Sequence, residues 1–349
     1  MNGTISMYIR NAATLVIVGI AMFLLFGTFV EFLETSAILF AALVVFVFYC
    51  GVILPAIDRW VAAKREVKGK TAHKASQTAI QRESDAFDRL PRRSRYSKVI
   101  VFISVLVISF FILHILVLMM HEFSHSTLAW LLGVKADPLN IIYGDLIGSG
   151  WDENVDYGVL FNAGRGSTAA AIAFAGPFSN IALFFVTAGL MAVKWVKEHR
   201  WAYHTIFWTS VITFIMIFEY VLTRSFMTHD DFGNINHGLG ISPWPIFITG
   251  TILGLIGLYY LYVYKLPEYF AIMTPDARTL QYISGAVVSF IIFLFYIGLR
   301  ITSYPEVPQW WFGTAGIVVL FIAPFIASPA RAWVQARISE YSDRKVWGE

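Results

Sequence analysis

The sequence is poor in charged residues and almost free of cysteine. Charged side chains make up 14% of its 349 residues, against roughly 25% in soluble domains. The one cysteine, Cys50, excludes an intrachain disulfide framework and a cysteine-rich metal cluster. If the chain binds a metal, histidine and carboxylate side chains must therefore supply the ligands.

Apolar residues take the place of the missing charges. They make up 57% of the chain, against roughly 45–50% in soluble domains. Several runs reach the ~20 residues that cross a hydrocarbon core as a helix, and their continuity excludes barrel strands, which alternate. We expect an all-α polytopic membrane protein. About eight transmembrane helices are predicted, over residues 12–30, 36–57, 99–133, 166–193, 203–222, 246–264, 280–300 and 311–328.

Basic residues separate clearly between the gaps that join these runs. All but four of the 26 Lys and Arg lie at Arg10, in the linker 58–98, in the gaps 194–200 and 265–278, or in the tail from residue 331. The positive-inside rule places these segments, and with them both termini, in the cytoplasm. The chain is therefore expected to be a multi-pass protein of the cell membrane.

The gap 134–165 differs in sequence from the other gaps. Glycines separate short apolar pieces, such as Leu-Asn-Ile-Ile-Tyr at 139–143 and Tyr-Gly-Val-Leu-Phe at 157–161. This pattern is typical of short strands and turns. Non-helical backbone near a membrane must be paired, buried in protein or hydrated. We expect a small β-hairpin-like loop directly after the third helix.

The third apolar run ends with ionisable residues, His-Glu-Phe-Ser-His at 121–125. Because His121 and His125 are four residues apart, a helix projects both imidazoles from one face, which suits one tetrahedral Zn²⁺. Glu122 lies beside them, where it can take a proton from an activated water. Ionisable side chains within an apolar run are costly unless they serve a function. The segment therefore predicts a zinc site with Glu122 as the general base.

A catalytic zinc normally has three protein ligands, so a third is expected. His114 lies about 10 Å along the helix from His121 and cannot reach the same metal. The remaining candidates stand in segment 228–237, which reads Thr-His-Asp-Asp-Phe-Gly-Asn-Ile-Asn-His. Since the third and fifth helices run in the same direction, this segment leaves the membrane on the same side as His125.

Within that segment, Asp231 is the preferred third ligand and Asp230 is the alternative. Asn234 follows Asp231 by about one helical turn, where it could brace the carboxylate. His229 and His237 are expected to act as supporting partners or caps.

These motifs resemble the site-2 protease class of intramembrane metalloproteases. The resemblance covers residues 99–240 and rests on the segment 121–125, Thr-Leu-Ala-Trp-Leu-Leu-Gly at 127–133, Gly-Pro-Phe-Ser-Asn at 176–180 and the aspartate-glycine segment that follows. It implies a three-helix catalytic core in which His121, His125 and one aspartate bind zinc. It also implies that Glu122 is the general base.

The resemblance further implies that the helix carrying Gly176 packs closely against the site, so Asn180 is expected to support the site or contact substrate. The family's aspartate motif usually reads Asn-Pro and then Leu-Asp-Gly, whereas this chain has His-Asp-Asp-Phe-Gly. The choice between Asp230 and Asp231 therefore stays open. The charge pattern also places the site near the outer face, whereas family members typically cut nearer the cytoplasm.

On this interpretation the chain has four parts. They are a two-helix membrane segment at 1–57, a basic cytoplasmic linker at 58–98, a three-helix metalloprotease core at 99–240, and a three-helix C-terminal membrane segment at 241–349. The expected activity is hydrolysis of peptide bonds in membrane-embedded or membrane-proximal substrates. The expected partners are such a protein or peptide and the lipid bilayer, with no nucleic acid.

Three other classes of protein remain open. A CAAX-type membrane metalloprotease would use Glu219, about three turns deeper in the fifth helix, as its third ligand. A membrane di-iron oxygenase or desaturase would need about eight histidines in several boxes, and three of the eight here (His73, His199 and His204) fall on the cytoplasmic side. A non-catalytic transporter or scaffold would bind no metal, or would bind one without hydrolysis.

Overall fold

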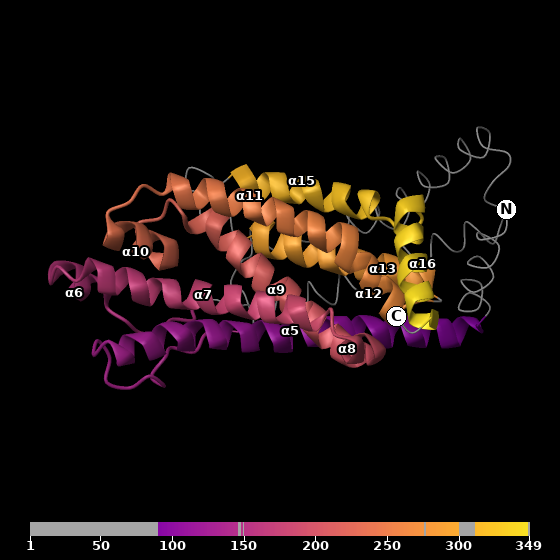
Figure 1. The fold of residues 1–349 in the computed structure, drawn as a ribbon, viewed down its shortest axis with the longest axis horizontal. Coiled ribbons are helices and arrows are strands. Elements are labelled where there is room, and N and C mark those ends of the chain that lie inside the picture. The colour runs from indigo at the N-terminus through magenta and orange to yellow at the C-terminus, as the bar shows by residue number, and fades with distance from the viewer. Residues whose placement is uncertain (1–89, 146–147, 149, 276, 300–310, 348–349) are drawn as a thin grey trace. The chain divides into compact units, whose positions relative to one another are not determined.

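The structure is a computed structural model that describes residues 90–145, 148, 150–275, 277–299 and 311–347 (Figure 1). The first two expected spans, at 12–30 and 36–57, lie outside these residues, as do residues 58–89 of the linker 58–98. The other six expected spans fall within them or nearly so.

The described residues are largely helical, as the apolar runs predict. Five helices are long and apolar enough to cross a membrane: Ser97–Leu131, Gly166–Leu190, Arg200–Arg224, Trp244–Met273 and Arg278–Leu299. A further apolar helix, α15 (Trp311–Ile326), is shorter. The prediction of an all-α membrane protein is thereby confirmed in its coarse form.

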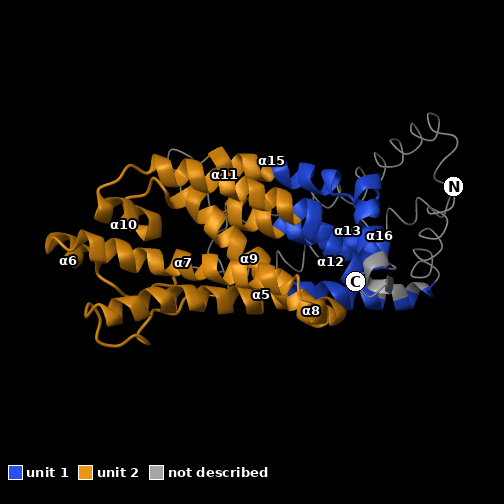
Figure 2. Cartoon of the chain, viewed as in Figure 1, with its two compact units in different colours: residues 1–108, 262–290, 318–349 blue, residues 109–261, 291–317 orange. Residues whose placement is uncertain are grey.

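The chain divides into two compact units (Figure 2). One comprises residues 1–108, 262–290 and 318–349, and the other comprises 109–261 and 291–317. The predicted site residues from 121 to 234 all lie in the second unit. The four-part division by sequence stays a prediction.

The first unit contains the end of the fourth described span and helices that follow it. The end of that span comprises most of the short π-helix η2 (Leu261–Lys265) and α12 (Leu266–Met273), and the helices that follow include α13 (Arg278–Ser289) and α16 (Ala332–Trp347). Helix α12 packs against α13 and α16. A buried ion pair joins Lys265 Nζ to Glu268 Oε2 at 2.8 Å, so the charges that an apolar helix can least tolerate are paired.

The second unit holds the candidate site. Its elements include the later part of α5 (Arg92–Leu131), α6 (Tyr157–Asn162), α7 (Gly166–Leu190), α8 (Lys194–Glu198), α9 (Arg200–Arg224), α10 (Asp230–Leu239) and α11 (Trp244–Tyr260). Helix α7 packs against α9 and α10, and α9 also packs against α11. The short helix α10 therefore lies where α7 and α9 meet.

Glycines let α10 approach its neighbours closely. A Cβ added at Gly238 would lie 2.3 Å from the carbonyl oxygen of Gly166 at the start of α7, and one at Gly233 would lie 2.6 Å from the carbonyl oxygen of Met227. The helix ends at Gly240 in the left-handed conformation (φ 62°), which glycine adopts without strain. These contacts hold the N-terminus of α10 beside the end of α9.

The loop after α5 folds back on itself at one point. Ile142 and Asp152 form an antiparallel bridge with N–H to O distances of 2.8 and 3.2 Å. The Ser126 hydroxyl ties the loop to α5 by donating to the Pro138 carbonyl at 2.8 Å. Among the described residues of this loop the bridge does not extend into strands, so the expected hairpin is reduced to a single paired position.

Candidate metal centre

Two histidines on successive turns of α5 form the base of the site. His121 and His125 are both buried, and their Nε2 atoms lie 3.1 Å apart. Helical spacing of four residues brings both rings onto one face, as the sequence predicts.

The N-terminus of α10 brings a carboxylate to the same point. Asp231 Oδ2 lies 3.0 Å from His121 Nε2, and Asp231 Oδ1 lies 3.2 Å from His125 Nε2. Ligands about 2.0–2.1 Å from a tetrahedral zinc stand roughly 3.3 Å from one another. The three side chains form a buried group that could hold a metal ion, since their ligand atoms all lie within 4.8 Å of one another.

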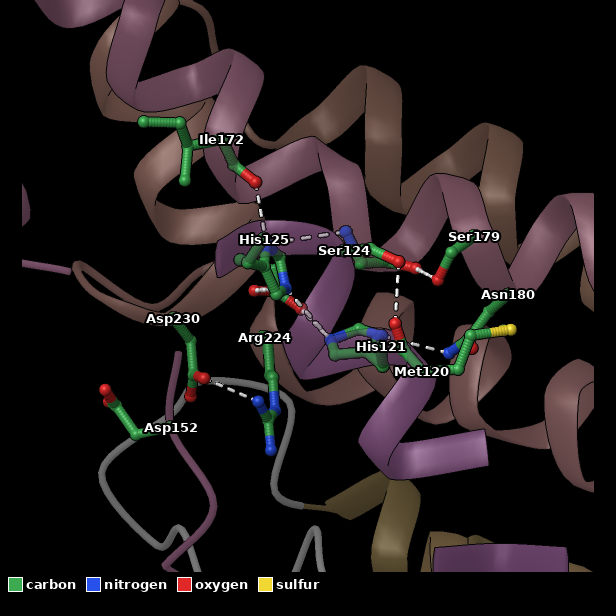
Figure 3. A network of polar contacts seen from close by, with 12 residues as sticks. Met120, His121, Ser124, His125, Asp152, Ile172, Ser179, Asn180, Arg224 and Asp230 are labelled. Carbon is green, nitrogen blue, oxygen red and sulfur yellow. Dashed lines mark hydrogen bonds and ion pairs between the residues drawn. The ribbon is translucent and has the colours of Figure 1, made fainter. Parts of the chain in front are cut away.

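His125 makes a hydrogen bond through Nδ1, so its Nε2 is able to bind a metal. Its Nδ1 lies 2.6 Å from the carbonyl oxygen of Ile172 in α7, and only an N–H at Nδ1 can donate to that oxygen (Figure 3). In the neutral ring, Nε2 then carries the lone pair. A backbone carbonyl that orients a histidine in this way is a usual companion of a metal ligand.

Asn180 contacts the Nδ1 atom of His121, as the Ile172 carbonyl contacts that of His125. Its Nδ2 lies 3.1 Å from His121 Nδ1, and its Oδ1 is buried without a hydrogen-bond partner among the described residues. Turning the amide by 180° would let Oδ1 accept a hydrogen bond from the N–H at Nδ1 and satisfy the orphaned oxygen. His121 Nε2 would then also present a lone pair toward Asp231.

In these tautomers the centre contains only hydrogen-bond acceptors. Two imidazole lone pairs and a carboxylate converge at 3.0–3.2 Å, an arrangement that is unfavourable unless a cation lies between them. The donor set therefore fits a cation that accepts nitrogen and oxygen ligands.

Gly176 has no side chain and therefore keeps space open at the centre. A Cβ at Gly176 of α7 would lie 2.1 Å from His125 Nε2 and 2.6 Å from His121 Nε2. No side chain can occupy this position while the rings keep their places. Gly176 therefore leaves open the region into which both lone pairs point.

The neighbouring Asp230 is held away from the histidines. Its carboxylate pairs with the Arg224 guanidinium, as Figure 3 shows, and its backbone adopts the left-handed conformation at φ 66°. The same guanidinium stacks 3.9 Å from the centre of the Tyr220 ring, which meets the His121 ring edge-to-face at a ring-centre separation of 5.4 Å. A series of contacts thus runs from Asp230 through Arg224 and Tyr220 to His121, and Asp231 faces the histidines.

Glu122 is buried beside the centre, with 6% of its surface exposed. Its place next to His121 in α5 keeps its carboxyl group near the three potential ligands.

Other sequence candidates lie apart from the metal group. His114 Nδ1 lies 2.6 Å from the Tyr296 hydroxyl. Glu219 Oε1 accepts a hydrogen bond from Thr223 at 3.1 Å, and Glu219 does not join the three potential ligands.

The remaining polar residues of segment 228–237 lie in or next to α10. His229 is exposed at the start of the helix, and His237 packs edge-on against Phe161. Asn234 is buried, but no hydrogen bond joins it to Asp231 within the described part of the chain. Instead, Asn236 donates to the Ser225 carbonyl at 2.8 Å and anchors α10 to the end of α9.

Two residues near the centre were not found by sequence reasoning. Glu153, in the loop after α5, is buried with 8% of its surface exposed. Tyr157 begins α6, and its hydroxyl oxygen is buried. The only sequence signal was an acidic and an aromatic residue in a glycine-rich loop, which is normally read as a solvated turn.

Comparison with known proteins finds no matching family, no matching curated protein and no matching solved structure. A functional assignment therefore rests on the site itself and on the motifs of the sequence.

Proposed function

We propose that this protein is an intramembrane zinc metalloprotease that hydrolyses peptide bonds of membrane-embedded or membrane-proximal substrates. The observation that carries the proposal is the convergence of His121, His125 and Asp231 beside the buried Glu122, in and next to a membrane-length helix. The motifs that resemble the site-2 protease class support the same assignment.

The donor set favours zinc among the common metals. Two imidazoles and one carboxylate are a usual ligand set for catalytic zinc, which keeps a fourth position open for water or substrate. The spacing of the donor atoms, 3.0–3.2 Å, suits a small four-coordinate ion better than calcium, whose ligands stand 2.3–2.6 Å from the metal.

The proposed chemistry divides between the metal and Glu122. A bound zinc ion would polarise both a water molecule and the substrate carbonyl. Glu122 accepts a proton from the water as its oxygen forms a bond to the carbonyl carbon. Glu122 then returns the proton to the amide nitrogen as the carbon–nitrogen bond breaks, which leaves a carboxylate and an amine.

The substrate segment must be extended, because a helix shields its own carbonyl groups. The backbone at Ile142, already bridged to Asp152 on one side, belongs to the loop that could pair with such a segment by strand addition. The proposed partner is therefore a membrane protein or peptide with a locally unwound region.

The proposed topology has eight spans with both termini in the cytoplasm. Introduced cysteines test it on the two sides of α7: Asp152→Cys before the helix and Glu198→Cys after it, in a Cys50→Ser background. Both positions are exposed. A membrane-impermeant maleimide should label position 152 from outside intact cells and position 198 only after the cells are opened. Labelling of both positions from one side would overturn this topology.

The activity can be tested while the substrate is still unidentified. Membranes from cells that produce the wild-type protein or Glu122→Gln are compared by mass-spectrometric mapping of new peptide termini in membrane proteins. Glutamine keeps the shape of Glu122 and leaves the three potential ligands unchanged, so the variant should retain zinc but lose the cleavages. Identical termini in both samples would contradict the proposal.

The competing functions predict other results. A CAAX-type enzyme would lose zinc on replacement of Glu219, a di-iron oxygenase would contain two irons, and a scaffold would show no cleavage at all. The position of Glu219 outside the three-residue group favours Asp231 over Glu219 as the third ligand.

A further inference from the structure

A second set of polar groups faces the candidate metal centre from the loop between α5 and α7. Its members are Glu153 and Tyr157, and neither has a function in the chemistry described above. Burying a carboxyl group or a hydroxyl without full compensation is costly. Their burial at this position therefore calls for an account of what they bind.

The segment that carries both residues is held in place on each side. The bridge from Asp152 to Ile142 precedes it, and the ammonium group of Lys135 donates to the Glu153 carbonyl. On the other side, Asp156 caps α6 by accepting a hydrogen bond from the Val159 amide at 3.1 Å. The backbone between these anchors is thus defined by contacts rather than left as a solvated turn.

The Tyr157 ring packs against the helices that build the metal centre. It packs against an apolar cluster that includes Ala173, Tyr220 and Phe232, which come from α7, α9 and α10. It also packs against a second cluster that includes Ala129, one turn beyond His125 on α5. Because these clusters include neighbours of the potential ligands, the ring lies at the edge of the centre.

The polar end of Tyr157 lies near enough to the charged groups of the site to be affected by them. Burial, then the adjacent carboxyl of Glu153, and then the charges of Asp231 and Glu122, raise the pKa of the Tyr157 hydroxyl far above its usual value. The hydroxyl therefore keeps its proton. The hydroxyl is buried beside the Glu153 carboxyl group, with which it interacts, and no other hydrogen-bond partner for it lies within the described residues.

Peptide hydrolysis needs such a donor. When water attacks, the carbonyl oxygen gains negative charge, and a prepared N–H or O–H group near that oxygen stabilises the transition state. Of the nearby donors, Arg224 is paired with Asp230, and Asn180 contacts His121. Tyr157 is a neutral donor at the edge of the centre.

On the basis of the proposed hydrolytic function, we propose that the Tyr157 hydroxyl turns from Glu153 and donates its one hydrogen bond to the substrate's carbonyl oxygen as that oxygen becomes negative. Glu153 holds the hydroxyl at the edge of the centre before the substrate binds. No proton is transferred by Tyr157 in this step. The proton from water goes to Glu122, and the new hydrogen bond only stabilises the charge on oxygen. Tyr157 is therefore a catalytic residue and Glu153 a positioning residue.

Acetohydroxamate provides a probe that does not depend on substrate sequence. It presents a negatively charged oxygen next to a carbonyl oxygen and binds to a metal whose coordination is incomplete. Its affinity for the full-length, zinc-loaded protein in detergent can be measured by titration calorimetry, and zinc affinity can be measured separately with a competing chelator. Both readouts are independent of turnover.

Tyr157→Phe should weaken acetohydroxamate binding about 10- to 100-fold, the usual effect of losing one hydrogen bond to a charged group, with zinc affinity unchanged. With the substrate identified by terminus mapping, kcat should fall by roughly 10²–10³. The matched control is Tyr143→Phe, which removes an exposed hydroxyl from the same loop and should change neither quantity. Glu153→Ala should weaken acetohydroxamate binding, and Glu153→Gln, which keeps an acceptor, should restore it.

Equal acetohydroxamate affinity in Tyr157→Phe and wild type would overturn this inference and leave the proposed hydrolysis standing. Loss of zinc in Tyr157→Phe would also overturn it, because the tyrosine would then maintain the fold of the centre. Failure of the wild-type protein to bind zinc, or cleavage by Glu122→Gln, would instead defeat the proposed function itself.

Discussion

Gly176 and His125 lie so close that a Cβ on the glycine would stand 2.1 Å from the imidazole Nε2. Real Cβ atoms do not approach a ring nitrogen this closely, so any side chain at position 176 must displace His125 or fill the space in front of it.

Gly176→Ala should therefore abolish high-affinity zinc binding, although the added group is only one methyl. Gly189→Ala, on the same helix, is the matched control, because a Cβ there meets no atom within 4 Å. Zinc content of the two purified variants, measured by elemental mass spectrometry, checks the prediction. Full zinc in Gly176→Ala would show that the metal lies elsewhere.

The left-handed backbone of Asp230 (φ 66°) and its ion pair with Arg224 should contribute separately to the placement of Asp231. Asp230→Ala removes the ion pair and keeps the unfavourable backbone, so we expect roughly 10- to 100-fold weaker zinc binding. Asp230→Gly removes the pair but relieves a strain of about 1–2 kcal/mol, so it should bind zinc roughly 5- to 30-fold more tightly than Asp230→Ala. Chelator competition measures both constants. Complete loss of zinc in both variants would instead favour Asp230 as a direct ligand.

Asn180 should affect the zinc affinity of the centre without itself binding the metal. Asn180→Ala leaves His121 Nδ1 without its partner at 3.1 Å and should weaken zinc binding roughly 10- to 100-fold. Asn180→Asp supplies an acceptor to the same nitrogen and should restore the affinity. If Asn180→Ala binds zinc as tightly as the wild type, the amide does not orient His121.

Much of this architecture could be predicted from the sequence. The apolar runs indicated six of the described helices, and the four-residue spacing of His121 and His125 indicated their common face. Both predictions depend only on regular helix geometry, which local sequence determines.

The sequence could not show what depends on contacts between distant segments. Asp231 rather than Asp230 lies beside the histidines because Asp230 has a left-handed backbone and pairs with an arginine on another helix, whereas sequence reasoning favoured Asp231 because of Asn234. The space at Gly176 exists only because α7 passes directly beside α5. Glu153 and Tyr157 were missed because the loop after α5 folds inward. Hydrophobic periodicity in the sequence cannot predict such a fold.

Glu153 should make the metal-free protein less stable as pH rises. Burial raises the pKa of its carboxyl above the reference value of 4.5, so the folded protein holds a proton that the unfolded chain has already released. The contribution to stability therefore falls as pH increases from about 4.5 through the raised folded value. Glu153→Gln cannot ionise and should lack this part of the decline.

Thermal unfolding of both proteins in detergent, with zinc removed by chelation, measures the effect across that range. The variant should gain stability relative to the wild type as pH rises. Parallel pH profiles would show that Glu153 is not buried as described.

The most direct test of the account is the metal content of the purified wild-type protein and of Asp231→Ala. Asp231 Oδ2 and Oδ1 lie 3.0 and 3.2 Å from the two histidine nitrogens, so removal of this carboxylate takes away one of the three ligands. Elemental mass spectrometry should find about one zinc per chain in the wild type and almost none in the variant. Two irons per chain, no metal in the wild type, or full zinc in Asp231→Ala would contradict a zinc centre formed by His121, His125 and Asp231.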